Sequence, residues 1–208
     1  MNQSKYIVVD QRRTLIPKLL EKWLEILNEL EEVFAPDNLP YVYNERAQIG
    51  ILAAAAIRLR CLTFEEYSRG KGQGPKRRAG RADLWLYDRD TGKDFNIEAK
   101  RQTVKWNSTD VASVVKESLD WAVKEVHELQ DRQAAYNLGI VLLCPWGAKP
   151  GGELEATPFW NQLRDRLSYD GDFCAFHLCE PKIWPNLKAH RDCPGIALVG
   201  KYHDAPVA

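Results

Sequence analysis

Three residues with the capacity for metal-assisted chemistry lie between Gly80 and Gln102. Asp83 precedes a turn, and Glu98 and Lys100 follow it in the order Glu-Ala-Lys. Two carboxylates can hold a hard divalent cation such as Mg²⁺, which prefers oxygen ligands. A lysine beside them can stabilise the charge of a phosphodiester under attack by water. The spacing therefore predicts the chemistry of a metal-dependent phosphodiesterase site.

A hairpin must bring these residues together. Residues 81–88 and 94–102 each alternate apolar and polar side chains, which predicts two strands. The segment 88–93 between them is rich in residues that favour turns. The sequence therefore predicts an antiparallel pair with the acidic residues on one of its faces.

The register of this hairpin decides whether the two carboxylates meet. A turn centred on residues 90–91 places Asp83 directly opposite Glu98. Lys100 then lies two residues along on the same face. A bulge at Gly92 would shift this register by one residue. Facing carboxylates repel unless a cation lies between them, and the alternative interpretation is the solvated polar face of an ordinary hairpin.

The pattern Asp83…Glu98-Ala99-Lys100 resembles the signature of the PD-(D/E)XK nuclease superfamily, which has the restriction-endonuclease-like fold. Ala82 stands where the family name has proline, a frequent departure that does not touch the chemistry. The resemblance implies a divalent-metal-dependent nuclease that hydrolyses phosphodiester bonds, with DNA as the favoured substrate and Mg²⁺ or Mn²⁺ as the cofactor.

The resemblance also implies roles for individual residues. The residues with implied catalytic roles are Asp83, Glu98, Lys100 and Gln102, of which the last matches a recurrent variant of the motif. Asp83, Glu98 and the backbone carbonyl of Ala99 would hold the metal. Glu45, at the start of the first core helix, would join them, although the helix dipole alone also favours an acid there. Lys100 would act electrostatically, because the carboxylates beside it favour its charged form.

The order of predicted elements around the motif agrees with the αβββαβ core that the resemblance implies. The predicted segments are a helix over 45–60 capped by Asn44, a short strand over 62–67, the hairpin, a helix capped by Ser108 or Thr109 and ending near residue 130, and a buried strand over 138–144. The predicted fold class is therefore α/β, with a mixed central sheet flanked by helices.

Three regions are expected along the chain of 208 residues. Residues 1–40 form an N-terminal extension with an amphipathic helix over 12–34. Residues 41–150 form the nuclease-like core. Residues 151–208 form a C-terminal α/β extension packed on the same domain, with a helix predicted over 157–169 and strands over 173–178 and 196–199.

Four residues of the C-terminal region, Cys174, His177, His190 and Cys193, have a spacing that resembles a zinc site. Cys174 and His177 are three positions apart in a predicted strand, so their side chains point to opposite faces. Burial in the core is therefore the favoured interpretation, and zinc is the alternative.

Composition bounds the compartment and the partners. Twenty-nine basic and 29 acidic residues cancel, so the net charge does not indicate nucleic-acid binding. No apolar run reaches the length of a membrane span, and the N-terminus has no secretory apolar region. Five cysteines at irregular spacing favour a reducing compartment. We therefore expect a cytoplasmic protein without membrane contact.

A local excess of positive charge lies directly before Asp83. Residues 69–81 read RGKGQGPKRRAGR, with six basic residues and no acid. This composition predicts a mobile loop that contacts the phosphates of a nucleic acid, with a merely solvated loop as the alternative. The candidate contact residues are Arg69, Lys71, Lys76, Arg77, Arg78 and Arg81.

Three hypotheses about function follow. The first is the metal-dependent nuclease, with endonuclease and exonuclease action both open. The second is a non-catalytic module on the same fold that binds nucleic acid or a partner protein. The third is the hydrolase part of a larger defence, restriction or repair system, in which partner subunits supply target recognition. A homodimer is a further alternative.

The basic segment yields a test of nucleic-acid contact. Neutralising Lys76, Arg77 and Arg78 together should weaken DNA binding and flatten its salt dependence, by up to about 0.9 in the log–log slope for each lost phosphate contact. The measurement is a binding titration at several salt concentrations. An unchanged slope would exclude these three residues from phosphate contact.

Overall fold

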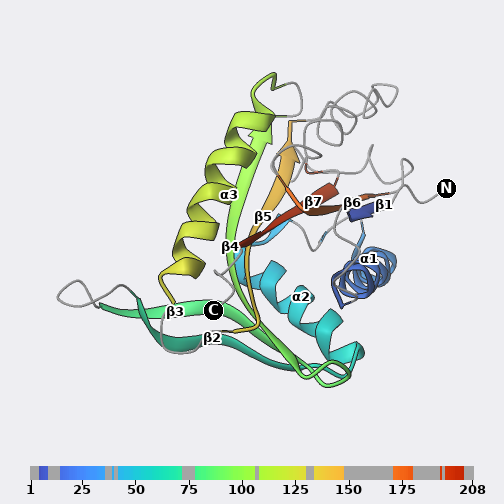
Figure 1. Ribbon diagram of the computed structural model, residues 1–208. Coiled ribbons are helices and arrows are strands. Elements are labelled where there is room, and N and C mark those ends of the chain that lie inside the picture. The colour runs from blue at the N-terminus through green and yellow to red at the C-terminus, as the bar shows by residue number, and fades with distance from the viewer. Residues whose placement is uncertain are drawn as a thin grey trace.

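The structure of the chain is a computed structural model. It describes residues 5–8, 15–35, 39, 42–71, 78–105, 108–129, 134–147, 171–179, 193 and 195–203, without the side chains of 5–8, 69–71 and 78–79. Through these residues runs one mixed sheet of seven strands in the order β1-β6-β7-β5-β4-β3-β2 (Figure 1). The predicted α/β class with a mixed sheet is therefore confirmed.

Consecutive strands of the described sheet pair antiparallel in three places: β2 with β3, β3 with β4, and β6 with β7. Its strands are β1 (Lys5–Val8), β2 (Leu62–Lys71), β3 (Arg78–Asp88), β4 (Lys93–Lys105), β5 (Tyr136–Trp146), β6 (Phe173–Leu178) and β7 (Gly195–His203). The helices are α1 (Leu15–Phe34), α2 (Glu45–Arg58) and α3 (Val111–His127). Only β4 and β5 pair in parallel among the described strands, and α3 makes the crossover between them.

Helices cover the sheet on two sides. In Figure 1, α3 runs along β4 and β5, whereas α1 and α2 lie together on the other side. The amphipathic face of α1 is buried along its length, with Trp23 and Leu27 fully enclosed. In α2, Ala53, Ala55 and Ala56 are buried, and their small side chains let the helix pack closely. No described helix combines the length and the apolar character needed to cross a membrane.

Most of the predicted element order is confirmed. The sequence of elements from α2 through β2, β3, β4 and α3 to β5 is as predicted, and so are the two C-terminal strands β6 and β7. Asn44 caps α2 as expected, because its Oδ1 accepts a hydrogen bond from the N–H of Ala47 at 3.0 Å. Strand β1 was not predicted; it pairs with β6.

Both ends of the basic segment 69–81 lie in strands instead of the loop that its composition predicted. Strand β2 extends to Lys71 instead of ending at residue 67, and β3 begins at Arg78. The two strands pair as far as Lys71 opposite Arg78. Hydrogen bonds to the neighbouring strand outweigh the weak strand propensity of the glycines in these strand ends. Residues 72–77 lie outside the described residues.

Helix boundaries also differ from the predictions. Helix α2 ends at Arg58 rather than residue 60, and α3 ends at His127 rather than near residue 130. Neither Ser108 nor Thr109 caps α3, since the N-cap is Asp110, whose side chain makes no capping hydrogen bond. Ser108 instead accepts a hydrogen bond from the N–H of Asp110 at 3.3 Å. The described part of α1 begins at Leu15, and the predicted residues 12–14 lie outside the described residues.

In the C-terminal region, His177 is a core residue. It is fully buried in β6, and its Nε2 lies 2.6 Å from the Oε2 of Glu31 in α1. Cys174 and Cys193 are buried as well, and no group of three or more metal-binding side chains occurs among the described residues. His190 and the predicted helix over 157–169 lie outside the described residues, so zinc binding stays untested.

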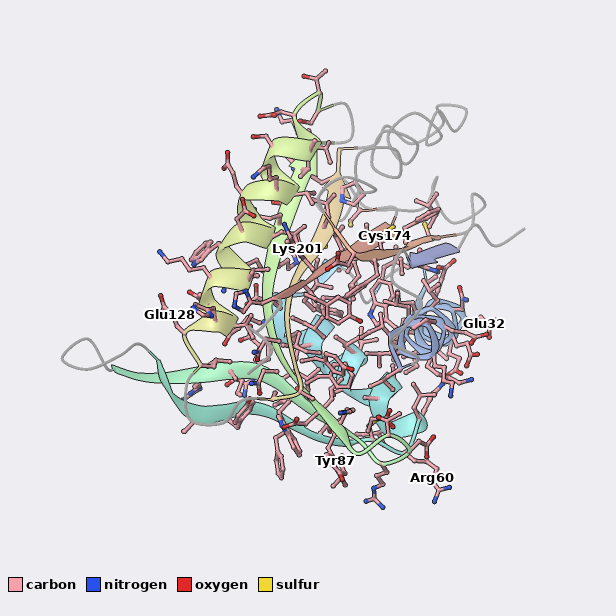
Figure 2. All side chains as sticks on the ribbon, viewed as in Figure 1. Glu32, Arg60, Tyr87, Glu128, Cys174 and Lys201 are labelled. Carbon is pink, nitrogen blue, oxygen red and sulfur yellow. The ribbon has the colours of Figure 1, made fainter. Side chains whose placement is uncertain are left out.

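The buried contact between His177 and Glu31 should hold α1 on the sheet. Replacing Glu31 by alanine should lower the free energy of unfolding by about 3 kcal/mol, because it leaves the buried His177 without this carboxylate. The matched control is Glu32→Ala, since Glu32 is exposed on the next position of the helix (Figure 2). Urea unfolding measures both; equal effects of the two substitutions would contradict a stabilising role for the pair.

Candidate active site

The hairpin of β3 and β4 has the predicted register. Leu84 lies opposite Ile97 and Trp85 opposite Asn96, and the same register continued by one residue puts Asp83 opposite Glu98. The turn closes on Gly92, which has a φ of 67°. The bulge considered at this glycine therefore does not shift the pairing.

Beyond this hairpin the two strands separate. Their described pairing stops at Leu84 and Ile97, whereas β4 continues beside β5 to Lys105. Figure 1 shows β3 leaving with β2 while β4 turns along α3. The backbone of β4 after Ile97 thus has a strand on one side only, and Glu98, Ala99 and Lys100 lie where the separation begins.

Two carboxylates take the place of the missing strand. The Oδ2 of Asp83 accepts a hydrogen bond from the N–H of Ala99 at 2.7 Å. The Oε2 of Glu45, at the start of α2, accepts one from the N–H of Arg101 at 2.7 Å. Alternate N–H groups of a strand point to the same side, so both carboxylates lie on the side of β4 that β3 has left. Backbone N–H groups need acceptors, and the two carboxylates supply them where β3 no longer does.

The carbonyl of Ala99 points into the same gap. In a strand, the N–H and C=O of one residue face the same neighbour. The N–H of Ala99 is directed at Asp83, so its carbonyl is directed away from β5 and toward the region between β3 and β4. The predicted ligand group therefore faces the carboxylate predicted to act with it.

Glu98 is buried beneath α3. It is 1% exposed and pairs in register with Gly139 of β5. Helix α3 comes so close there that a Cβ on Gly139 would lie 2.6 Å from the backbone nitrogen of Val123. Asn96, on the same face of β4, is also buried. The alternative of a solvated polar face is therefore wrong for this part of β4.

Lys100 is held by two residues of α3. Its Nζ lies 3.0 Å from the Oε2 of Glu125, with side chains that are 15% and 21% exposed. The same Nζ lies 4.9 Å from the ring centre of Trp121, whose Nε1 donates to the Oε1 of Glu125 at 3.0 Å. The sequence interpretation missed both residues, although a tryptophan and a glutamate four positions apart share one face of a helix.

The charges of these residues act on one another. Burial raises the pKa of Glu45, and the negative charges of Asp83 and Glu125 raise it further. The hydrogen bond from Arg101 and the positive charge of Lys100 oppose this rise. Acidic residues from α2, β3 and α3 thus form one electrostatic cluster around a single lysine.

The remaining predicted residues lie around this cluster. Gln102 is half-buried on β4, opposite Leu143. Arg81 is exposed, and its Nη1 contacts Glu66 at 2.9 Å. Arg69, Lys71 and Arg78 belong to strands, but their side chains lie outside the described residues, as do Lys76 and Arg77 entirely. Of the six predicted phosphate contacts, Arg81 is therefore the one whose side chain is placed, and it is ion-paired.

Strand β2 is distorted opposite Asp83. Glu66 has a φ of 45°, a left-handed conformation that non-glycine residues rarely adopt. The ladder between β2 and β3 holds on either side of it, at Glu65 with Leu84 and at Tyr67 with Ala82. Backbone strain of this kind is a hint of function when it lies beside a candidate site.

The donor atoms fit a hard divalent cation in their chemistry. Asp83, Glu98, Glu45 and the Ala99 carbonyl offer oxygen, which Mg²⁺ and Mn²⁺ prefer. Within the described residues, however, no group of three or more acidic, histidine or cysteine side chains is arranged as a preformed metal site. A bound cation would therefore require these carboxylates to turn a second oxygen toward it or to leave the N–H groups of β4.

Comparisons with known proteins give no relative from which to transfer a function. No protein-family model, no curated protein and no solved structure matches the chain. The chemistry of the site must therefore be inferred from its own residues and geometry.

The raised pKa of Glu45 gives a test of the cluster. Glu45→Gln keeps an acceptor for the N–H of Arg101 and removes a negative charge, so the metal-free protein should become more stable by about 0.5 kcal/mol near neutral pH. The stability that wild-type Glu45 contributes is complete below its ordinary pKa of 4.5 and is lost as the pH rises through the raised value. The advantage of the variant should therefore grow with pH above 4.5.

Urea unfolding between acid and neutral pH, in EDTA, measures this difference, with Glu32→Gln as a control for an exposed helical glutamate. Adding Mg²⁺ should then stabilise the wild type more than Glu45→Gln. An equal response of the two proteins to Mg²⁺ would exclude Glu45 from metal binding.

Proposed function

We propose that this protein is a divalent-metal-dependent nuclease whose site lies where β3 and β4 separate, with DNA as the favoured substrate. The observation that carries the proposal is the anchoring of Asp83 and Glu45 on the N–H groups of Ala99 and Arg101, on either side of Lys100. The resemblance of Asp83…Glu98-Ala99-Lys100 to the PD-(D/E)XK signature supports the same chemistry.

The negative charge of the site supports a requirement for a cation. Three carboxylates, those of Glu45, Asp83 and Glu125, act electrostatically on one another beside Lys100, and a fourth, that of Glu98, is buried two residues before it on β4. A phosphodiester is itself an anion, so it would be repelled from this cluster unless a cation is bound. Mg²⁺ or Mn²⁺, when bound, supplies this charge, polarises the phosphodiester and lowers the pKa of an attacking water.

The residues of the site would have separate roles in metal binding, charge stabilisation and orientation of the phosphate or water. Asp83, Glu98 and the carbonyl of Ala99 would hold the metal, and Glu45 would complete its ligands from α2. Lys100 would stabilise the charge that develops on the phosphate, and Glu125 and Trp121 limit the positions its ammonium can take. Gln102 would orient the phosphate or the water.

A non-catalytic module that binds nucleic acid or protein is the second candidate function. The ion pair between Lys100 and Glu125 favours this second candidate. A lysine whose charge is neutralised by a carboxylate can stabilise the fold without acting on a substrate. Under this hypothesis Asp83 and Glu45 act only as caps for the backbone of β4. Action as one subunit of a defence, restriction or repair assembly is compatible with either candidate.

Cleavage assays distinguish the two candidates. The wild type should cut supercoiled, linear or single-stranded DNA, or RNA, in Mg²⁺ or Mn²⁺ but not in EDTA. Lys100→Ala should reduce the rate by about 100-fold or more, because it removes a charge aimed at the transition state. Lys93→Ala, an exposed lysine at the start of the same strand, should leave the rate unchanged.

Thermal unfolding of both variants shows whether a lost rate reflects a lost fold. Absence of cleavage of all four substrates by the folded wild type, together with no metal binding by calorimetry, would overturn the nuclease proposal. The second candidate would then stand.

A further inference from the structure

Three aromatic rings form a row on β2 and β3, one of them exposed and the other two half-buried. We call Phe64, Trp85 and Tyr87 the aromatic platform. The ring centres of Phe64 and Trp85 are 5.5 Å apart, and those of Trp85 and Tyr87 are 6.1 Å apart and stacked within 16° of parallel. Phe64 is 61% exposed, which is unusual for a phenylalanine in a sheet.

Core packing does not explain these rings. Leu84 and Leu86 alternate with Trp85 and Tyr87 along β3, and both leucines are fully buried on the opposite face. The indole of Trp85 is fixed in place, because its Nε1 donates to the Oδ2 of Asp94 at 3.2 Å. The platform is therefore an aromatic surface in which Trp85 is held in place and Phe64 is the ring most exposed to solvent.

The platform is continuous with the candidate active site. Trp85 and Tyr87 lie on the same face of β3 as Asp83, since side chains alternate along a strand. Phe64 is the cross-strand partner of Trp85. Positions two residues apart on a strand are about 6.6 Å apart, so the backbone of Trp85 lies about this distance from that of Asp83.

Basic residues lie on the other side of Asp83 along β3, away from the rings. Beyond Asp83 comes the exposed Arg81, and β3 begins at Arg78. A ligand lying along β3 would thus meet aromatic rings, then the acidic cluster, then positive charge. Nucleic acid matches this order, because it carries aromatic bases and anionic phosphates on one chain.

We propose that the aromatic platform stacks unpaired bases of the nucleic acid whose backbone enters the candidate site, so that the substrate class is a single strand or an unpaired end. This inference deepens the proposed function and rests on it for the identity of the site. Every base has a π-face, so the stacking is tolerant of sequence. A duplex keeps its bases stacked inside the helix, and the platform therefore discriminates against it.

Binding without hydrolysis tests the platform. Fluorescence anisotropy with labelled, hydrolysis-resistant analogues of oligothymidylate, oligouridylate and a duplex is measured in Mg²⁺, so that a cation offsets the acidic cluster and cleavage does not interfere. Phe64→Ala should weaken binding of at least one single strand roughly 5- to 100-fold and leave duplex binding unchanged. Phe64→Tyr should restore single-strand binding because it restores the ring, and the salt dependence should be the same in all variants.

A matched control is Phe34→Ala, which removes a phenylalanine that is 47% exposed at the end of α1. It should bind as the wild type does. Because Phe64 is exposed, its replacement should leave the fold intact, and thermal unfolding checks this.

Equal affinity of the wild type and Phe64→Ala for both single strands would overturn the proposal. So would an equal loss for duplex and single strand, or sedimentation as a dimer that Phe64→Ala dissociates without changing oligonucleotide affinity, since the platform would then join two copies of the chain. A protein that binds single strands through Phe64 but cleaves nothing in Mg²⁺ would overturn the nuclease proposal alone.

Discussion

The backbone of β4 must find hydrogen-bond partners where β3 leaves it, and this requirement fixes the candidate site. A buried N–H without a partner costs about 1–3 kcal/mol. Asp83 and Glu45 supply acceptors to the N–H groups of Ala99 and Arg101, so both carboxylates are held by the fold itself. The separation of the two strands, which also turns the carbonyl of Ala99 into the gap, therefore creates the site and orients its acids.

The same arrangement concentrates negative charge. Burial and neighbouring carboxylates raise the pKa of Glu45, which means that the folded chain holds this charge less readily than the unfolded chain does. Lys100 and Glu125 compensate part of the charge through a partly buried ion pair. Natural proteins break local rules of stability mainly at functional sites. The strained backbone of Glu66 beside Asp83 is a second departure at the same place.

The parts of the site that depend on local pattern were predictable from the sequence, and those that depend on packing between distant elements were not. Alternation and a turn centred on residues 90–91 were enough to predict the register of β3 and β4, in which Leu84 pairs with Ile97 next to Asp83 and Glu98. The contacts of Lys100 with α3 depend on how closely that helix approaches Gly139, which no local pattern encodes. The pairing of β1 with β6 joins opposite ends of the chain, so it was missed for the same reason.

Core packing and the exposed features of β3 depend on one register. Leu84 and Leu86 are buried, whereas Asp83, Trp85 and Tyr87 lie on the other face. A slip of one residue would expose both leucines and turn the carboxylate and the rings inward, because side chains alternate with a period of two. The two leucines thus specify where the acid and the aromatic platform lie. Any partner that uses both the carboxylate of Asp83 and the rings of Trp85 and Tyr87 must lie along β3, since this β-strand presents them in fixed order and spacing.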